Sequence, residues 1–131
     1  MRAVPLCLAF LASAAPAFAQ APMTVAEFLV RAAPLERLGP AAVLHPAYPA
    51  LRDEVRAAGQ AYGADIAAQR RRGGPVHSCP PDGARLDPQL VLAEFRAIPP
   101  AQARRMTVKQ GLYLVAKRRF PCPAGRSAAR R

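Results

Sequence analysis

Apolar residues recur at helical spacing from Thr24 onward. Thr24 is a favourable helix N-cap, and Glu27 three positions later predicts a capping box. The apolar residues that follow fall on one helical face: Val25, Phe28, Leu29 and Ala32. Proline cannot donate the hydrogen bond of a helix interior, so Pro34 predicts that this helix ends or kinks near Ala33, after which Leu35 resumes the apolar stripe.

A short helix and a long helix are predicted next. Pro40 suits the first turn of a short helix through Leu44, which stops before His45-Pro46. Pro49 suits the first turn of a long helix. The apolar stripe of that long helix consists of Leu51, Val55, Ala58, Tyr62 and Ile66. Gly59-x-x-x-Gly63 weakens it by about 1 kcal/mol per glycine relative to alanine, and small residues there would let another helix approach closely.

Two further helices are predicted after a loop at residues 73–87. Asp87-Pro88 combines an N-cap with a first-turn proline. The apolar residues of the helix that follows predict that it is the most buried one: Leu90, Val91, Leu92, Phe95 and Ile98. Pro99-Pro100 ends it, and Thr107 with Gln110 predicts a second capping box at the start of the last helix. No segment alternates like a strand, so we expect an all-α fold of four to five helices.

Residues 1–19 have the pattern of a cleavable signal peptide. Arg2 gives a positive start, and residues 6–15 form an apolar run that is too short to span a membrane. Ala17-Phe18-Ala19 supplies the small side chains that a signal peptidase accepts, so cleavage is expected after Ala19 and the mature chain is expected in the periplasm. The alternative is an N-terminal membrane anchor that is never cut.

The mature chain has the length of one domain. We assign residues 20–123 to this single all-α domain. Residues 124–131 are small and basic, which predicts a disordered tail.

The cysteines agree with export. Cys7 leaves with the signal peptide, and Cys79 and Cys122 remain as a pair in an oxidising compartment, where we expect them to be bonded to each other. Closing a loop of this length would stabilise the fold by roughly 4 kcal/mol in the chain-entropy model. The alternatives are two free thiols or a metal site with His45 and His77. The spacing of these residues is not that of a zinc motif, so neither a metal nor a cofactor is expected.

The net charge of +11 points to acidic partners. Three basic clusters stand out along the chain: Arg70-Arg71-Arg72, Arg104-Arg105 with Lys109, and Lys117-Arg118-Arg119. One interpretation is a docking surface for an acidic protein face or weak contact with an anionic membrane, and the other is ordinary helix ends combined with a compositional bias toward arginine. The aromatic residues follow apolar stripes rather than the basic clusters, so nucleic acid is not an expected partner.

No catalytic constellation is visible. The two histidines lie in loops beside proline or serine, Ser78 is interpreted as a loop residue rather than a nucleophile, and Gly73-Gly74 lacks the Lys-Ser/Thr of a phosphate loop. The chain is therefore not expected to be an enzyme.

Five segments together resemble the Rap–Tai immunity domain: Met23–Leu29, Leu51–Tyr62, Ser78–Pro81, Met106–Val108 and Phe120–Cys122. The resemblance covers roughly residues 22–123. It implies a compact, often dimeric, all-α protein of the periplasm. Such proteins protect bacteria from amidase effectors of type VI secretion by plugging the active-site cleft with a protruding loop.

The loop at residues 71–82 is our first candidate for that role, because a loop anchored at Cys79 loses less entropy on binding. The candidate partner-binding residues are Arg70, Arg71, Arg72, His77 and Ser78. The alternative is an envelope-associated structural or interaction module of the same fold that has no toxin partner and contacts anionic lipid or another envelope protein.

Overall fold

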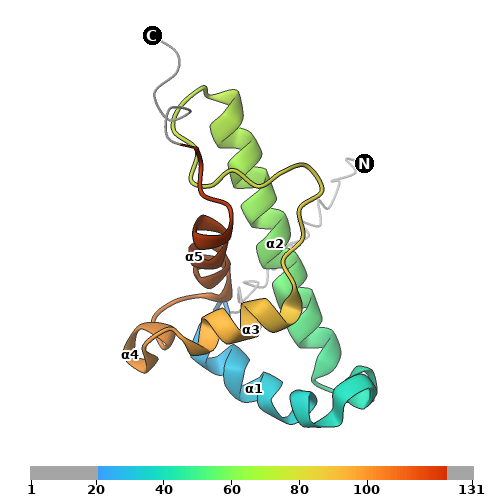
Figure 1. The fold of residues 1–131 in the computed structure, drawn as a ribbon. Coiled ribbons are helices and arrows are strands. Elements are labelled where there is room, and N and C mark those ends of the chain that lie inside the picture. Colours follow the sequence, from blue (N-terminus) through green and yellow to red (C-terminus); the bar gives the residue numbers. More distant parts are fainter. Residues whose placement is uncertain (1–20, 124–131) are drawn as a thin grey trace, which may run out of the picture.

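The computed structural model describes residues 21–123, and every named element within that range is a helix (Figure 1). The elements are α1 (Val25–Leu38), the 3₁₀ helix η1 (Gly39–Leu44), α2 (Tyr48–Arg71), α3 (Pro88–Arg96), α4 (Pro100–Ala103) and α5 (Val108–Arg119). The predicted all-α class and the predicted disulfide are both confirmed. None of these helices is long and apolar enough to cross a membrane. The predicted signal peptide and the predicted tail lie outside the described residues.

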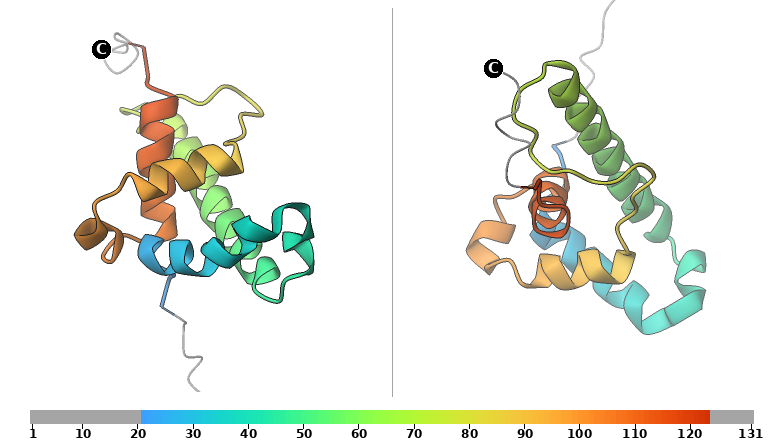
Figure 2. Two further views of the ribbon diagram at one scale, coloured as in Figure 1. Left: turned by 60° about the horizontal axis from the view of Figure 1, so that its bottom comes forward. Right: turned by 45° about the horizontal axis from the view of Figure 1, so that its top comes forward.

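The long helix α2 runs the length of the domain, about 36 Å at 1.5 Å per residue for its 24 residues. Helix α5 packs beside it, and the C-terminal ends of both point the same way (Figures 1 and 2). Helices α1 and α3 contact each other and lie toward the N-terminal half of α2. Residues 72–87, here called the connecting segment, descend from the end of α2 and cross that helix before entering α3 (Figure 1).

The core lies where α1, α2, α3 and α5 meet. Phe28 and Phe95 pack edge to face with their ring centroids 5.8 Å apart, a favoured aromatic geometry. The largest fully buried core side chains are Val25, Phe95, Val108 and Val115. Helix α5 buries five residues and α3 only two, so the prediction that α3 is the most buried helix was wrong. The reason is geometric: α5 packs against α1, α2 and α3 at once, so more of its side chains face other helices.

The starts of α1 and α5 satisfy each other's free backbone groups. The N–H of Val25 donates to the carbonyl of Met106 at 2.8 Å, and the N–H of Val108 donates to the carbonyl of Met23 at 3.0 Å. The first N–H groups of a helix have no partner within the helix, so this exchange replaces contacts with water. Two segments far apart in sequence are thereby joined next to the core.

Both predicted N-caps at these helix starts are present, and one capping box is complete. The Thr107 hydroxyl accepts the N–H of Gln110, whose side chain accepts the N–H of Thr107. At α1 the Thr24 hydroxyl accepts the N–H of Glu27, but the Glu27 carboxylate pairs with Arg31 instead of returning to the cap. The first box is therefore only half formed.

Proline positions account for two further differences from the predictions. Of the two predicted outcomes, an end near Ala33 is wrong: helix α1 continues through Pro34 to Leu38, because Ala32 before the proline and Leu35 after it are both buried in the core. Pro34 deprives only the carbonyl of Val30 of its partner, and Val30 is 74% exposed, so water can replace that bond. Pro99-Pro100 ends α3 as predicted, but Pro100 also opens the short helix α4, as a first-turn proline can.

Candidate partner-docking surface

The disulfide ties the connecting segment to the end of α5. Cys79 and Cys122 are bonded, with their Cα atoms 4.9 Å apart, and the N–H of Cys79 donates to the carbonyl of Phe120 at 2.8 Å. The alternative of two free thiols is therefore not realised. His45, named with them as a possible metal ligand, lies at the turn before α2, where its Nδ1 accepts the N–H of Ala47. The described residues contain no group of three or more potential metal ligands.

Ser78 ties the same segment to α2. Its side chain is fully buried, and its hydroxyl lies 2.6 Å from the Tyr62 hydroxyl. The Nδ1 of His77 lies 3.3 Å from the same Ser78 oxygen. Ser78 was grouped with the partner-binding candidates, but in this structure it offers no surface to a partner and instead holds the segment in place.

His77 is the third attachment point. Its backbone N–H donates to the side-chain oxygen of Gln69 at 2.7 Å, and its ring packs against Tyr113 with the ring centroids 5.0 Å apart. Burial lowers the pKa of His77 below its ordinary value, and the positive charge of Lys117 lowers it further. Both effects disfavour the protonated imidazole in the folded protein.

A polar network behind His77 joins α2 to α5. Tyr113 donates its hydroxyl hydrogen bond to Asp65, and Lys109 lies 3.0 Å from the same carboxylate. These two contacts lower the pKa of Asp65, while burial followed by the Asp65 hydrogen bond raises the pKa of Tyr113. Tyr62 packs edge to face on Tyr113 with centroids 5.1 Å apart. Sequence reasoning missed this network, although Lys109 and Tyr113 at i and i+4 on α5 share one face.

The three arginines at the end of α2 divide into two roles. Arg70 donates to the carbonyl of Pro80 at 3.0 Å and lies 3.9 Å from the Asp82 carboxylate, so it helps to hold the connecting segment. Arg71 and Arg72 are exposed and form no ion pair with any described residue. They are two of the exposed positive charges of this surface, and the charge of Arg72 contributes to lowering the pKa of Asp65.

The other two basic clusters are separated by the fold. Lys117, Arg118 and Arg119 end α5, which points the same way as the end of α2 (Figures 1 and 2). Arg104 and Arg105 follow α4, at the other end of the domain. The structure thus brings two of the three clusters toward one end of the molecule.

Exposed stretches lie on either side of the attachment points. Residues 73–75 and 81–85 are exposed, whereas His77, Ser78, Cys79 and Pro80 are buried or half-buried. Gly73 and Gly83 have φ angles of 67° and 74°, in the left-handed region that favours glycine, and each allows a sharp turn. The result is a segment fixed in its middle with an exposed turn on each side.

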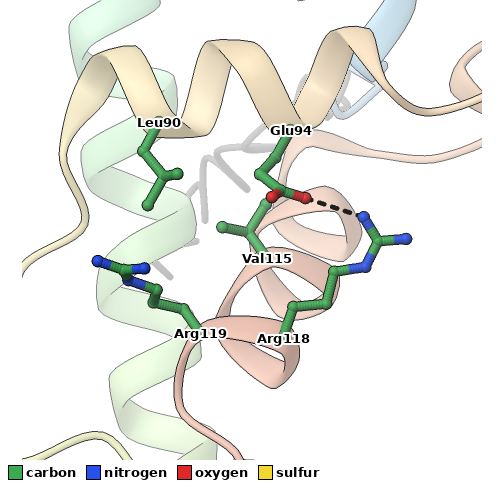
Figure 3. A pocket seen from close by; sticks show the side chains of 5 residues that line it. All are labelled: Leu90, Glu94, Val115, Arg118 and Arg119. Carbon is green, nitrogen blue, oxygen red and sulfur yellow. Dashed lines mark hydrogen bonds and ion pairs between the residues drawn. The ribbon is translucent and has the colours of Figure 1, made fainter.

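Two hollows lie near this surface. A groove of about 530 Å³ separates the C-terminal half of α2 from residues 80–86, with Arg70 and Arg71 among its lining residues. A smaller pocket of about 130 Å³ lies between α3 and α5 (Figure 3). There Arg118 pairs with Glu94 at 2.8 Å, so part of the positive charge at the end of α5 is already neutralised.

Comparison of the chain with protein-family models, curated proteins and solved structures found no match.

Proposed function

We propose that this protein is an exported, non-catalytic binding protein that inhibits a cell-wall amidase effector of type VI secretion by occluding its active-site cleft. The resemblance to the Rap–Tai immunity domain suggests this role. The structural observation that supports it most is the connecting segment, which is fixed at residues 77–80 and exposed at residues 73–75.

A preformed loop suits an inhibitor. Five contacts hold the middle of the segment: the disulfide, the Cys79–Phe120 backbone bond, the buried Ser78 hydroxyl, the His77–Gln69 bond and the Arg70–Pro80 bond. Because these residues are ordered before any encounter, less conformational entropy is lost when the loop enters a cleft. The exposed turn at Gly73–Pro75 is the part that would enter it.

The charges beside the loop would guide such an encounter. Arg71 and Arg72 stand free next to residues 73–75, and they would attract an acidic rim around the amidase cleft. Attraction of this kind raises the association rate and weakens with salt.

The neighbouring Ser78 and His77 resemble a nucleophile and a base, but the geometry favours binding over catalysis. The Ser78 side chain has no exposed surface, so no substrate carbonyl can reach its oxygen. Its hydroxyl is also hydrogen-bonded to Tyr62. A catalytic serine needs an accessible position for the reacting carbon, which this one lacks.

The test uses the oxidised mature chain and a small amidase encoded beside it in the genome. We expect the protein to inhibit release of peptides from peptidoglycan at one-to-one stoichiometry. Arg71→Glu with Arg72→Glu should weaken inhibition at least about tenfold, since two favourable charges become repulsive. The matched control is Arg104→Glu with Arg105→Glu, an exposed adjacent pair at the other end of the domain.

A second variant tests the loop itself. Nothing lies within 4 Å of the position where a Cβ would stand on Gly74, so Gly74→Trp adds bulk to the exposed turn from a side chain that begins in open space. Inhibition should be lost if this turn enters the cleft. Full inhibition by Gly74→Trp, or an equal effect of the two arginine pairs, would contradict the proposal. Salt-sensitive co-sedimentation with anionic vesicles, without any amidase inhibition, would instead support the envelope module.

A further inference from the structure

The groove beside α2 combines an apolar floor with a free positive charge. On one side it is lined by Gly59, Gly63 and Ala67 of α2, and on the other by Pro80, Leu86 and Phe120. Its volume of about 530 Å³ lies within the range of about 300–1,000 Å³ that is usual for ligand clefts. Residues 80–86 cross α2 and form its outer wall (Figures 1 and 2).

The two glycines leave the floor open. Nothing lies within 4 Å of the position where a Cβ would stand on Gly59 or Gly63. Both occupy the interior of a helix, where glycine costs about 1 kcal/mol relative to alanine. The helix therefore carries two destabilising residues at the point where an occupant could approach its backbone.

The charge of the lining residues selects the occupant. Arg70 is engaged by the Pro80 carbonyl and lies near Asp82, which is itself fully exposed. Arg71 lines the same groove and has no acidic partner among the described residues. The lining thus holds two arginines and one aspartate, Asp82, and a carboxylate is the group that would complement Arg71. The chain's own residues 124–131 hold three arginines and no acid, so they would place like charge against Arg71.

We propose that this groove binds an extended segment of a partner protein in which an apolar side chain precedes a glutamate or aspartate. The apolar side chain lies over Gly59 and Gly63, and the carboxylate meets the Arg71 guanidinium. The proposal stands on the groove alone and does not depend on amidase inhibition.

The experiment is an NMR titration of ¹⁵N-labelled, oxidised mature protein with two capped dipeptides. Acetyl-Leu-Glu-amide is the probe, and acetyl-Leu-Gln-amide is its isosteric control. At concentrations up to about 10 mM, which covers millimolar dissociation constants, we expect saturable shifts at the amides of Gly59, Gly63 and Ala67. The glutamate probe should bind about three- to fivefold more tightly, the preference typical of one exposed ion pair.

Two variants separate the parts of the proposal. Arg71→Gln should abolish the preference for glutamate while leaving the apolar contact, whereas Arg104→Gln at the other end of the domain should change nothing. Gly63→Leu adds a side chain to the floor from a position with no neighbouring atom within 4 Å of its Cβ, and it should remove binding of both probes. Absence of saturable shifts at the groove, equal affinity of the two probes for the unmodified protein, or undiminished binding to Gly63→Leu would overturn the proposal. None of these results depends on the existence of a toxin.

Discussion

Two helical glycines differ in the space around them, and the difference predicts that alanine substitutions change stability in opposite directions. A Cβ on Gly111 would lie 2.8 Å from Phe95 Cε1 and 2.9 Å from Val25 Cγ2, so α5 approaches α1 and α3 only because this residue has no side chain. A Cβ on Gly63 would meet nothing. Gly111 is therefore required by packing, whereas Gly63 is not required by the packing of the isolated chain.

Gly111→Ala should destabilise the protein by about 1–3 kcal/mol, the usual cost of overpacking a core, which exceeds the gain in helix propensity. Gly63→Ala, the matched control, should stabilise it by up to about 1 kcal/mol. Urea unfolding followed by circular dichroism measures both. If Gly111→Ala were as stable as the unmodified chain, the close packing of α5 on Phe95 would be wrong.

The titration of His77 gives a second prediction at the scale of one residue. Burial and Lys117 lower its pKa in the folded state, so between that lowered value and about 6.5 the unfolded chain binds a proton that the folded chain does not. Stability should therefore rise with pH across this window, and the contribution should be lost as the pH falls through it.

His77→Gln should flatten this rise, and the check is a series of urea unfolding curves between about pH 5 and 7. The absolute stability of the variant is a separate quantity, because the substitution also removes the ring packing on Tyr113. Only the slope tests the titration. An unchanged slope in His77→Gln would assign the pH dependence to other groups.

At the scale of the elements, one hydroxyl pair, Ser78 with Tyr62, helps to hold the connecting segment against α2. Ser78→Ala should cost about 1–3 kcal/mol because it leaves the Tyr62 hydroxyl without its partner. Tyr62→Phe should behave similarly, and the double variant should cost less than the sum of the two, since both remove the same interaction. Thermal or urea unfolding of the four proteins completes the cycle. Strict additivity would show that the two hydroxyls do not stabilise each other.

Most helices were predictable because capping residues in the local sequence mark where they start. Thr24, Asp87 and Thr107 each cap a helix through the side chain, as their positions before apolar stripes indicate. The continuation through Pro34 was not predictable locally, because it is decided by the burial of Leu35 against other helices. Helix α4 was missed for a related reason: a proline pair signals an end, and only the structure shows that Pro100 also begins a turn.

At the scale of the whole molecule, the candidate surface was only partly predictable. The disulfide followed from counting cysteines in a chain that its first residues predict to be exported, and the loop it anchors followed from its glycines and prolines. The different roles of the three arginines could not be predicted. Arg70 holds the connecting segment whereas Arg71 and Arg72 form no ion pair with a described residue, and this difference depends on the path of residues 80–82. The groove was missed for the same reason. It forms because residues 80–86 fold back against α2, and the sequence does not indicate that path.

The disulfide affects both the stability of the whole domain and the position of the connecting segment, so its removal tests both. It closes a separation of 43 residues, for which the chain-entropy model gives about 4 kcal/mol. Reduction, or the paired substitution Cys79→Ser with Cys122→Ser, should lower the free energy of unfolding by about this amount. The loss should appear in urea unfolding with and without dithiothreitol, and the double-serine variant should not respond to the reductant.

The same variant tests whether the bond also shapes the docking surface. Native-state hydrogen exchange reports local opening residue by residue. Without the bond, the Cys79 amide that donates to Phe120 should exchange much faster, and so should the His77 amide that donates to Gln69. The core amides of α5 should lose protection only in proportion to the global stability. Equal loss at every amide would mean that the disulfide stabilises the fold as a whole without ordering the loop in particular.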